Sequence, residues 1–325
     1  MRKIRDLLIV GLGSIGSRHL KIISDLRPEI NIYVLRRPGY KKSNLDHLIK
    51  KVYTNIDDAI KFGFDAAIIA SPSSFHIDQA TKFVEKKIPI LIEKPLSNKL
   101  EDSLNFSKIA KANNSIILVG YVLRYTSILQ RFREIILKES FEKINSINIK
   151  CSSFLPNWRG NKNYKDTVSA KKSLGGGVLL ELSHEIDYAN WIFGPITILK
   201  SETFNSGKLD IDVEDEVKIL AKSNGCHNIK IDLDFHKNEN KRFCLVNLEN
   251  SSIKLDFIEK EIIIKSKKSL KKEFFSEDYY EMYNKQIIHF FSCIERNINP
   301  NVTLNDGIFT MELINIAFSS NLNNH

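Results

Sequence analysis

The positions of apolar residues divide the chain into two parts with different rhythms. In residues 1–121, short continuous apolar runs alternate with stretches whose apolar residues repeat at helical spacing. Continuous runs are typical of strands buried on both faces, and their alternation with helices predicts a parallel sheet covered on both sides. The predicted strands are 6–10, 31–35, 51–53, 65–70, 88–93 and 115–120. We therefore expect a doubly wound, Rossmann-type α/β domain in residues 1–121.

The remaining residues, 122–325, place several strand-like runs one after another. A helical pattern at 126–137 and a strand at 144–154 are followed by a long polar segment and a helix from Val178 to Phe193. Further strand-like runs occupy 215–223, 228–235, 244–250, 252–257 and 261–265, and helical patterns at 279–296 and 304–319 close the chain. Consecutive strands with short turns predict an α+β domain with a large open, mostly antiparallel sheet.

Composition narrows the class of protein. Of the 325 residues, 42% are hydrophobic and 27% charged, which is typical of a globular protein. No apolar run approaches the ~20 residues of a membrane helix, and the apolar start leads into a glycine turn and not into a cleavage site. Four widely spaced cysteines without a Cys-x-x-Cys pair indicate a cytoplasmic protein with neither disulfides nor a metal site.

The net charge of +9 leaves a nucleic-acid-binding protein as an alternative based on charge. The densest basic run, 265–272, is typical of a solvated hairpin, however, and no nucleic-acid-binding motif accompanies it. We therefore expect neither nucleic acid nor a membrane as a partner.

The turn after the first strand, "GLGSIG" at 11–16, fits the dinucleotide-binding pattern. Gly11 permits the tight turn, Gly13 lets the backbone approach a pyrophosphate, and Gly16 allows close helix–strand packing. Together with Ser14 and Ile15 these glycines open a helix whose N-terminal N–H groups attract phosphates. The second strand ends in Arg36 and Arg37, where NAD-binding domains usually carry an acid. Two guanidiniums favour the 2′-phosphate of NADP, although one of them stacking on adenine would leave NAD acceptable.

Polar residues also follow the later strands of the first part. Ser71, Pro72 and His76 follow the fourth strand, Glu93 and Lys94 end the fifth, and Arg124 follows the sixth. Ligands of such sheets bind beyond the carboxyl ends of the strands. We therefore expect all of these residues to line one crevice beside the glycine turn and to bind the cofactor.

In order along the chain, these motifs resemble those of the Gfo/Idh/MocA family, which includes glucose–fructose oxidoreductase and inositol dehydrogenases. The resemblance rests on the glycine turn followed by Arg18-His19, on Ser71-Pro72 with His76, on Glu93-Lys94-Pro95, on "GGGVLLELSHEID" at 175–187, and on Asp306-Gly307. It implies NAD(P)-dependent oxidation or reduction at a sugar carbon. It also implies a second domain whose open sheet forms a homodimer or homotetramer interface.

The resemblance assigns catalysis to Lys94, His184 and Asp187. His184 is a candidate base for the hydroxyl proton, and Lys94 is expected to hold the substrate oxygen. Family members usually have an Asp four residues before this histidine, whereas Glu181 stands three before His184. Both spacings face the same way on a continuous helix, but Glu reaches further, so a role for Glu181 as a substrate ligand stays open.

The polar segment 153–177 predicts the class of substrate. It contains Trp158, Arg159 and several lysines, and a loop of this length without its own structure is usually functional or disordered. A lid in which Trp158 packs on a sugar ring and Arg159 pairs with an anion would suit an acidic or nucleotide-activated sugar. Three alternatives stay open: a solvated basic loop, a reductase of a non-sugar carbonyl or imine, and a cofactor-loaded sensor without catalysis.

Overall fold

The computed structural model describes residues 3–138, 144–160 and 163–322, which fold into two compact units. The first consists of Met1–Val122 and Asp278–Ile308, and the second of Leu123–Glu277 and Phe309–His325. The return of Asp278–Ile308 to the first unit differs from the expectation that residues 122–325 form one domain.

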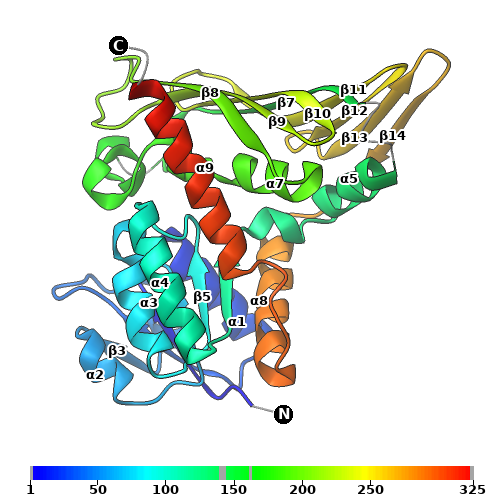
Figure 1. Ribbon diagram of the computed structural model, residues 1–325. Helices are drawn as coiled ribbons and strands as arrows, with labels where there is room; N and C mark the ends of the chain where they lie inside the picture. Colours follow the sequence, from blue (N-terminus) through cyan, green and yellow to red (C-terminus); the bar gives the residue numbers. More distant parts are fainter. Residues whose placement is uncertain (1–2, 139–143, 161–162, 323–325) are drawn as a thin grey trace. The chain divides into compact units, whose positions relative to one another are not determined.

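The first unit contains six strands, all parallel to their neighbours, in the order β3-β2-β1-β4-β5-β6 (Figure 1). They are β1 (Asp6–Val10), β2 (Asn31–Leu35), β3 (Lys51–Tyr53), β4 (Ala66–Ile69), β5 (Ile90–Glu93) and β6 (Ile117–Gly120). The apolar runs that predicted β1, β2, β4, β5 and β6 are almost completely buried, as a sheet covered on both faces requires, whereas β3 at the sheet edge buries only Tyr53. This arrangement confirms the predicted Rossmann-type sheet.

The helices of the first unit are α1 (Ser14–Leu26), α2 (Ile56–Ile60), α3 (His76–Val84), α4 (Leu100–Asn113) and α8 (Tyr279–Arg296). Helix α8 packs on α1, where Arg18 lies over the ring of Tyr283 and Tyr280 donates a hydrogen bond to Asp25. These contacts explain why the segment that begins at Asp278 belongs to the first unit. The helical pattern of α8 could not show which sheet its apolar face would cover.

The second unit is built on eight strands in the order β14-β13-β12-β11-β7-β10-β9-β8. They are β7 (Ile144–Ser153), β8 (Thr197–Phe204), β9 (Glu216–Ser223), β10 (Cys226–Asp234), β11 (Asn240–Leu248), β12 (Ser251–Asp256), β13 (Glu261–Ser266) and β14 (Leu270–Phe274). Only β7 and β10 pair in parallel among these neighbours, which confirms the predicted mostly antiparallel sheet.

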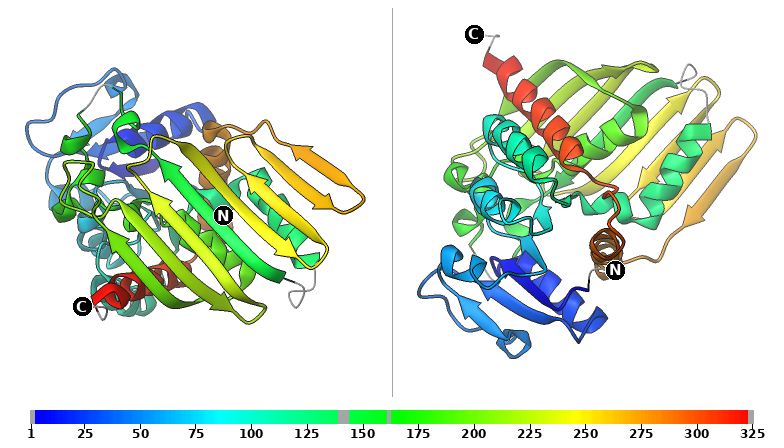
Figure 2. Two further views of the ribbon diagram at one scale, coloured as in Figure 1. Left: turned by 90° about the horizontal axis from the view of Figure 1, so that it is seen from above. Right: turned by 60° about the horizontal axis from the view of Figure 1, so that its bottom comes forward.

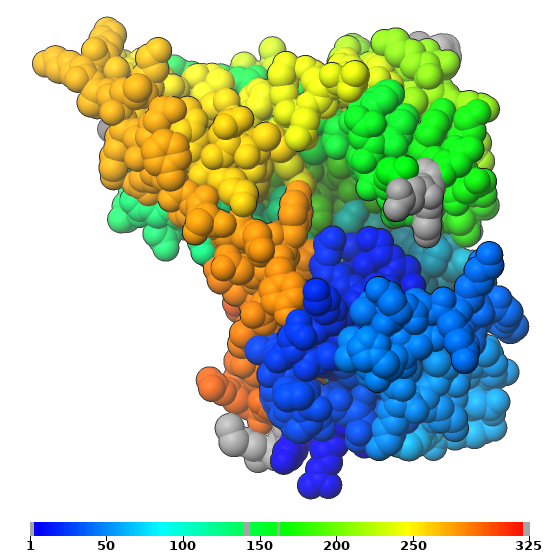
Figure 3. All heavy atoms as spheres, turned by 180° about the vertical axis from the view of Figure 1, so that it is seen from behind, coloured from blue at the N-terminus to red at the C-terminus, as the bar shows by residue number. Residues whose placement is uncertain are grey.

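One face of this sheet is covered by helices α5 (Ser127–Lys138) and α7 (His184–Phe193). In the left view of Figure 2 the described strands present their other face, and no helix of this unit lies in front of it. The basic run at 265–272 lies on the β13–β14 hairpin, as predicted, and this hairpin, gold in Figure 3, stands at the edge of the sheet. Helix α9 (Leu304–Leu322) begins in the first unit and continues in the second.

The described ranges contain neither a membrane-spanning helix nor a metal-binding cluster. Within them, none of the helices combines the length and the apolarity that a bilayer crossing needs. They also contain no cluster of three or more His, Cys, Asp or Glu side chains suited to a metal ion. The four cysteines, Cys151, Cys226, Cys244 and Cys293, are buried and form no disulfide.

Candidate functional site

The three glycines of the turn between β1 and α1 meet different steric requirements. Gly11 has a φ of +88°, and a Cβ there would lie 3.0 Å from the carbonyl oxygen of Ala70. A Cβ on Gly16 would lie 2.0 Å from the carbonyl oxygen of Gly11, so only glycine lets α1 start this close to the strand. A Cβ on Gly13 would meet no atom within 4 Å, because it would point into open space.

This open space adjoins the N-terminus of α1, where Gly13 and Ser14 are exposed and no acidic residue occupies the first turn. The turn lies where the strand order reverses between β1 and β4, the position at which ligands of such sheets bind. The residues present therefore fit a dinucleotide pyrophosphate, which the backbone of Gly13 and the N–H groups at Ser14 and Ile15 would hold.

The two arginines that follow β2, Arg36 and Arg37, have different surroundings. Arg36 donates to Asp46 at 3.1 Å and to the carbonyl oxygen of Lys41 at 3.1 Å, and its guanidinium lies 4.3 Å from the ring centroid of Tyr40. The hydroxyl of Ser43, with Arg36, holds the pKa of Asp46 below its ordinary value. Arg37, in contrast, is exposed. The structure thus neutralises Arg36 locally and leaves Arg37 facing solvent.

The segment after β4 bends back toward the end of β5. Ser71 donates to the side chain of Gln79 at 2.6 Å, and Pro72 precedes a 3₁₀ turn that leads into α3. His76 is buried, and its two ring nitrogens each lie 2.9 Å from a backbone carbonyl oxygen, that of Pro95 and that of Ser71. Burial lowers the pKa of His76. His76, which was predicted to bind the cofactor, therefore uses both ring nitrogens in contacts with backbone carbonyl groups of the protein.

Glu93, at the end of β5, is a buried carboxylate with a specific partner. His19 Nε2 lies 2.6 Å from Glu93 Oε1, and both side chains are nearly inaccessible to solvent. The other oxygen, Oε2, accepts the backbone N–H of Lys94 at 3.3 Å. A Cβ on Gly120 would lie 2.9 Å from this oxygen, so the glycine that ends β6 makes room for the carboxylate. Lys94 itself is half-buried and precedes a cis peptide bond to Pro95.

In the second unit the triple glycine leads into two short helices, where the sequence predicted one. Helix α6 (Val178–Glu181) ends after four residues, Leu182 leaves the helical conformation, and α7 begins at His184. The predicted continuous helix from Val178 to Phe193 is therefore wrong, and the argument that Glu181 and His184 share one helical face does not hold. Glu181 Oε1 instead accepts a hydrogen bond from the hydroxyl of Ser169 at 2.9 Å.

Asp187 and Arg124, which the sequence assigned to catalysis and to the cofactor, form one buried ion pair within the second unit. Arg124 Nε donates to Asp187 Oδ2 at 2.9 Å and Arg124 Nη2 to Oδ1 at 2.6 Å, a two-pronged geometry. The guanidinium also lies 5.3 Å from the ring centroid of Trp191. His184, the first residue of α7, is half-buried and lies one turn before Asp187.

Glu214 is a residue of this region that the sequence analysis missed. Its carboxylate accepts the backbone N–H of Leu179 at 3.1 Å, and a Cβ on Gly177 would lie 2.4 Å from Glu214 Oε1. Gly177, with a φ of +111°, thus leaves room for this side chain at the start of α6. Burial raises the pKa of Glu214 to about 7. An acid directly before a predicted strand gives no local sign that it will turn inward.

The segment predicted as a structureless lid contains four short 3₁₀ helices, at Leu155–Asn157, Tyr164–Asp166, Val168–Ala170 and Lys172–Leu174. Its residues 161–162 lie outside the described residues. Trp158 Nε1 donates to the hydroxyl of Ser153 at 2.8 Å, and its ring stands nearly perpendicular to that of Phe235, with the ring centroids 5.1 Å apart. Arg159 is half-buried. Contacts with Ser153 and Phe235 of the second unit therefore fix the Trp158 side chain without a substrate.

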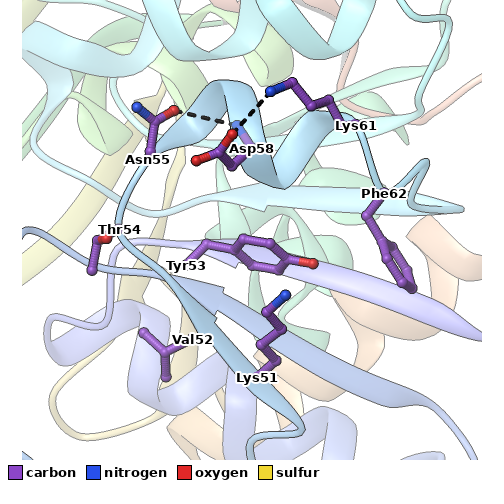
Figure 4. Close-up of a pocket in the computed structure, with 8 residues that line it drawn as sticks. All are labelled: Lys51, Val52, Tyr53, Thr54, Asn55, Asp58, Lys61 and Phe62. Atoms are coloured by element: carbon purple, nitrogen blue, oxygen red, sulfur yellow. Dashed lines mark hydrogen bonds and ion pairs between the residues drawn. The ribbon is translucent and has the colours of Figure 1, made fainter.

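An open depression of ≈ 560 Å³ lies at the β3 edge of the first sheet (Figure 4). It is lined by Lys51, Val52, Tyr53, Thr54, Asn55, Asp58, Lys61 and Phe62. On the α2 side, Asn55 Oδ1 accepts the backbone N–H of Asp58, and Lys61 donates to the Asp58 carboxylate (Figure 4). None of the predicted site residues is among these lining residues, but the backbone N–H of Arg36 donates to the carbonyl oxygen of Tyr53 at 2.9 Å.

Comparison with known proteins finds a family model that matches most of residues 1–122 of the first unit. Residues 5–121 match the family model GFO_IDH_MocA, described as an oxidoreductase family with an NAD-binding Rossmann fold. This match confirms the predicted resemblance over those residues.

Two curated relatives extend the likeness beyond residue 121. The chain is 24% identical over 220 residues to the rhizopine catabolism protein MocA of Rhizobium meliloti, covering 66% of each protein. It is 23% identical over 239 residues to an inositol 2-dehydrogenase of Mycolicibacterium gilvum, covering 68% of this chain and 62% of that protein. The matches span less than two thirds of the length of these relatives.

The fold as a whole is also found among solved structures. The WlbA dehydrogenase of Bordetella pertussis, solved in complex with NADH and UDP-GlcNAcA, is 18% identical, with a TM-score of 0.82 and coverage of 100% of this chain and 98% of that chain. At this identity the likeness shows the fold alone.

Proposed function

We propose that this protein is an NAD(P)-dependent sugar oxidoreductase, because residues 5–121 match the model of an oxidoreductase family with an NAD-binding Rossmann fold. It transfers a hydride between the nicotinamide and a secondary alcohol or ketone of a sugar or sugar derivative. The observation that carries the proposal is the open space at Gly13, beside the exposed N-terminus of α1 and at the reversal of strand order.

The bound nicotinamide supplies the hydride acceptor, and the protein handles the oxygen and its proton. In the oxidative direction the half-buried Lys94 ammonium donates a hydrogen bond to the substrate oxygen, and His184 takes the hydroxyl proton as general base. Asp187 is neutralised by Arg124, which suits it to positioning α7 better than to exchanging a proton. These roles are proposed from chemistry, since Lys94 belongs to the first unit and His184 to the second.

For the choice of cofactor, we propose that NADP is accepted through Arg37. Asp46 occupies Arg36, whereas Arg37 is an exposed cation at the end of β2, and Lys41 and Lys42 are exposed nearby. Arg37→Ala should therefore weaken NADP binding more than NAD binding, by calorimetry, and Arg36→Ala should weaken NADP less than Arg37→Ala does. Equal losses of both cofactors in Arg37→Ala would refute a role in reading the 2′-phosphate.

We propose an anionic sugar, either a uronate or a nucleotide-activated sugar, as the substrate. The support is Arg159 beside Trp158 in a basic segment, together with the UDP-GlcNAcA bound to the WlbA dehydrogenase of similar fold. Lys165 is paired with Asp210 at 2.6 Å, so Arg159 carries more of this argument than the lysines do. The test compares a neutral hexose with its uronate and its nucleotide-diphosphate form, each in wild type and Arg159→Ala. Equal turnover of the neutral sugar and an unchanged Michaelis constant in the variant would refute the anionic substrate.

The proposed function and its two cofactor-binding alternatives, a reductase of other compounds and a non-catalytic sensor, give different outcomes in a broad screen that follows the absorbance of the reduced nicotinamide. A sugar oxidoreductase reduces NAD(P) with at least one polyol or sugar. A reductase of a non-sugar carbonyl or imine consumes NADPH with such compounds alone, and a sensor binds cofactor without turnover of either class.

The helix-free face of the second sheet supports a homodimer or homotetramer as the assembled form. Light scattering coupled to size-exclusion chromatography tests this directly. A monomer at micromolar concentration would contradict it.

A further inference from the structure

The Arg18-His19 pair is a motif of the sequence that the proposed function leaves without a role. His19 lies in α1, shortly after the glycine turn, yet its side chain is directed into the protein and fully buried. Its Nε2 bonds to Glu93, and its Nδ1 has no hydrogen-bond partner in the part of the chain that the structure describes. The polar contact of this buried ring is therefore devoted to Glu93.

The bond from His19 is one of two histidine contacts that converge on the same short turn. Glu93 and Pro95 flank Lys94, and His19 bonds to the carboxylate of the first while His76 contacts the carbonyl oxygen of the second. The histidines come from different helices, α1 and α3, so they fix the turn from two directions. Glu93 passes the constraint on directly, because its second oxygen accepts the N–H of Lys94.

We propose that His19 and His76 are positioning residues that set the backbone of Lys94, acting through Glu93 and Pro95. For catalysis this inference rests on the proposed role of Lys94. A lysine side chain has four rotatable bonds, so its reach depends on where its backbone is held. A misplacement of about 1 Å at a reacting group can cost on the order of a hundredfold in rate. The Glu93–His19 bond also links the glycine turn, through α1, to the segment that carries the lysine.

The obvious alternative is that both histidines only stabilise the core. Stability and positioning separate in a cycle of single and double variants, because residues that act through one another are not additive. His19→Leu removes the bond, and His19→Gln keeps an N–H donor at the same number of bonds from Cβ. His289, half-buried in α8 of the same unit, accepts the backbone N–H of Asn301 at 2.9 Å, so His289→Leu, which removes a histidine hydrogen bond elsewhere in the unit, is the matched control.

The first measurement needs no substrate. Acylation of Lys94 by acetic anhydride is followed by mass spectrometry over a range of pH, in wild type and each variant. We expect His19→Leu and Glu93→Gln to change the rate at Lys94 at least about threefold, His19→Gln to stay closer to wild type, and His289→Leu to leave it unchanged. Unaltered acylation of Lys94 in both His19→Leu and Glu93→Gln would overturn the inference, even if the proteins were less stable.

The second measurement uses a substrate from the screen above. We expect His19→Leu to lower kcat by about tenfold with little change in the NAD(P) dissociation constant. In a Lys94→Ala background the same substitution should have no further effect on kcat. A loss of equal size in both backgrounds would show that His19 acts independently of Lys94. If the wild-type protein did not bind NAD(P) at all, the proposed function would be wrong. The acylation rates would still show whether His19 positions Lys94.

Discussion

The raised pKa of Glu214 leads to a specific prediction about stability and pH. The half-buried carboxylate lies against Gly177 and bonds to the N–H of Leu179, and burial raises its pKa from 4.5 to about 7. The folded protein therefore binds this proton more tightly than the unfolded chain. The stability that it contributes is fully present below pH 4.5, is lost as the pH rises toward 7, and is gone above that value.

The size of the effect follows from the two pKa values. A rise from 4.5 to about 7 corresponds to a loss of at most about 3 kcal/mol of unfolding free energy between mildly acidic and alkaline pH, at about 1.4 kcal/mol per pKa unit. Glu214→Gln keeps an oxygen for the N–H of Leu179 but has no charge to bury. We therefore expect the variant to be more stable than wild type by about 2–3 kcal/mol at pH 8 and by at most about 1 kcal/mol at pH 5.

Urea unfolding followed by circular dichroism, at several pH values between 5 and 8, measures this difference. Glu249→Gln, at an exposed position in the same unit, is the matched control and should run parallel to wild type. If Glu214→Gln and wild type lose stability equally as the pH rises, the buried carboxylate is not the cause and the reasoning fails.

Three further predictions address the two units separately. Gly16→Ala should abolish NAD(P) binding measured by calorimetry, since its Cβ would lie 2.0 Å from the carbonyl oxygen of Gly11. Gly39→Ala is the control: its Cβ would meet no atom within 4 Å, so NAD(P) affinity should stay within about threefold of wild type despite some loss of stability. Asp187→Asn should lower the unfolding free energy of the second unit by about 3–5 kcal/mol, because Arg124 is left buried without its charge partner; a loss below about 1 kcal/mol in urea unfolding would contradict this. Lys94→Ala should lower turnover about a hundredfold or more while NAD(P) still binds, and near-normal turnover would remove Lys94 from the mechanism.

Some of this architecture was determined by local sequence. Continuous apolar runs specified five buried strands of the first unit, because a strand covered on both faces has no polar side to display. The glycines at 11, 13 and 16 likewise predicted their turn, since backbone conformation and close approach are local requirements. The strand-rich second half was recognised for the same reason, although its helix at 178–193 was not, because the break at Leu182 leaves the apolar spacing almost unchanged.

Tertiary structure decided which polar residues meet. His19 and Glu93 are 74 residues apart, Arg124 and Asp187 are 63 apart, and neither pair leaves a periodic signal in the sequence. The sequence likewise gives no sign that Glu214 packs against Gly177. Nor does it show that Asp46 bonds to Arg36 and leaves the adjacent Arg37 exposed. Periodicity records which face of an element is buried, but a charge becomes a partner, a ligand or a buried acid only through the neighbours that the folded chain brings to it.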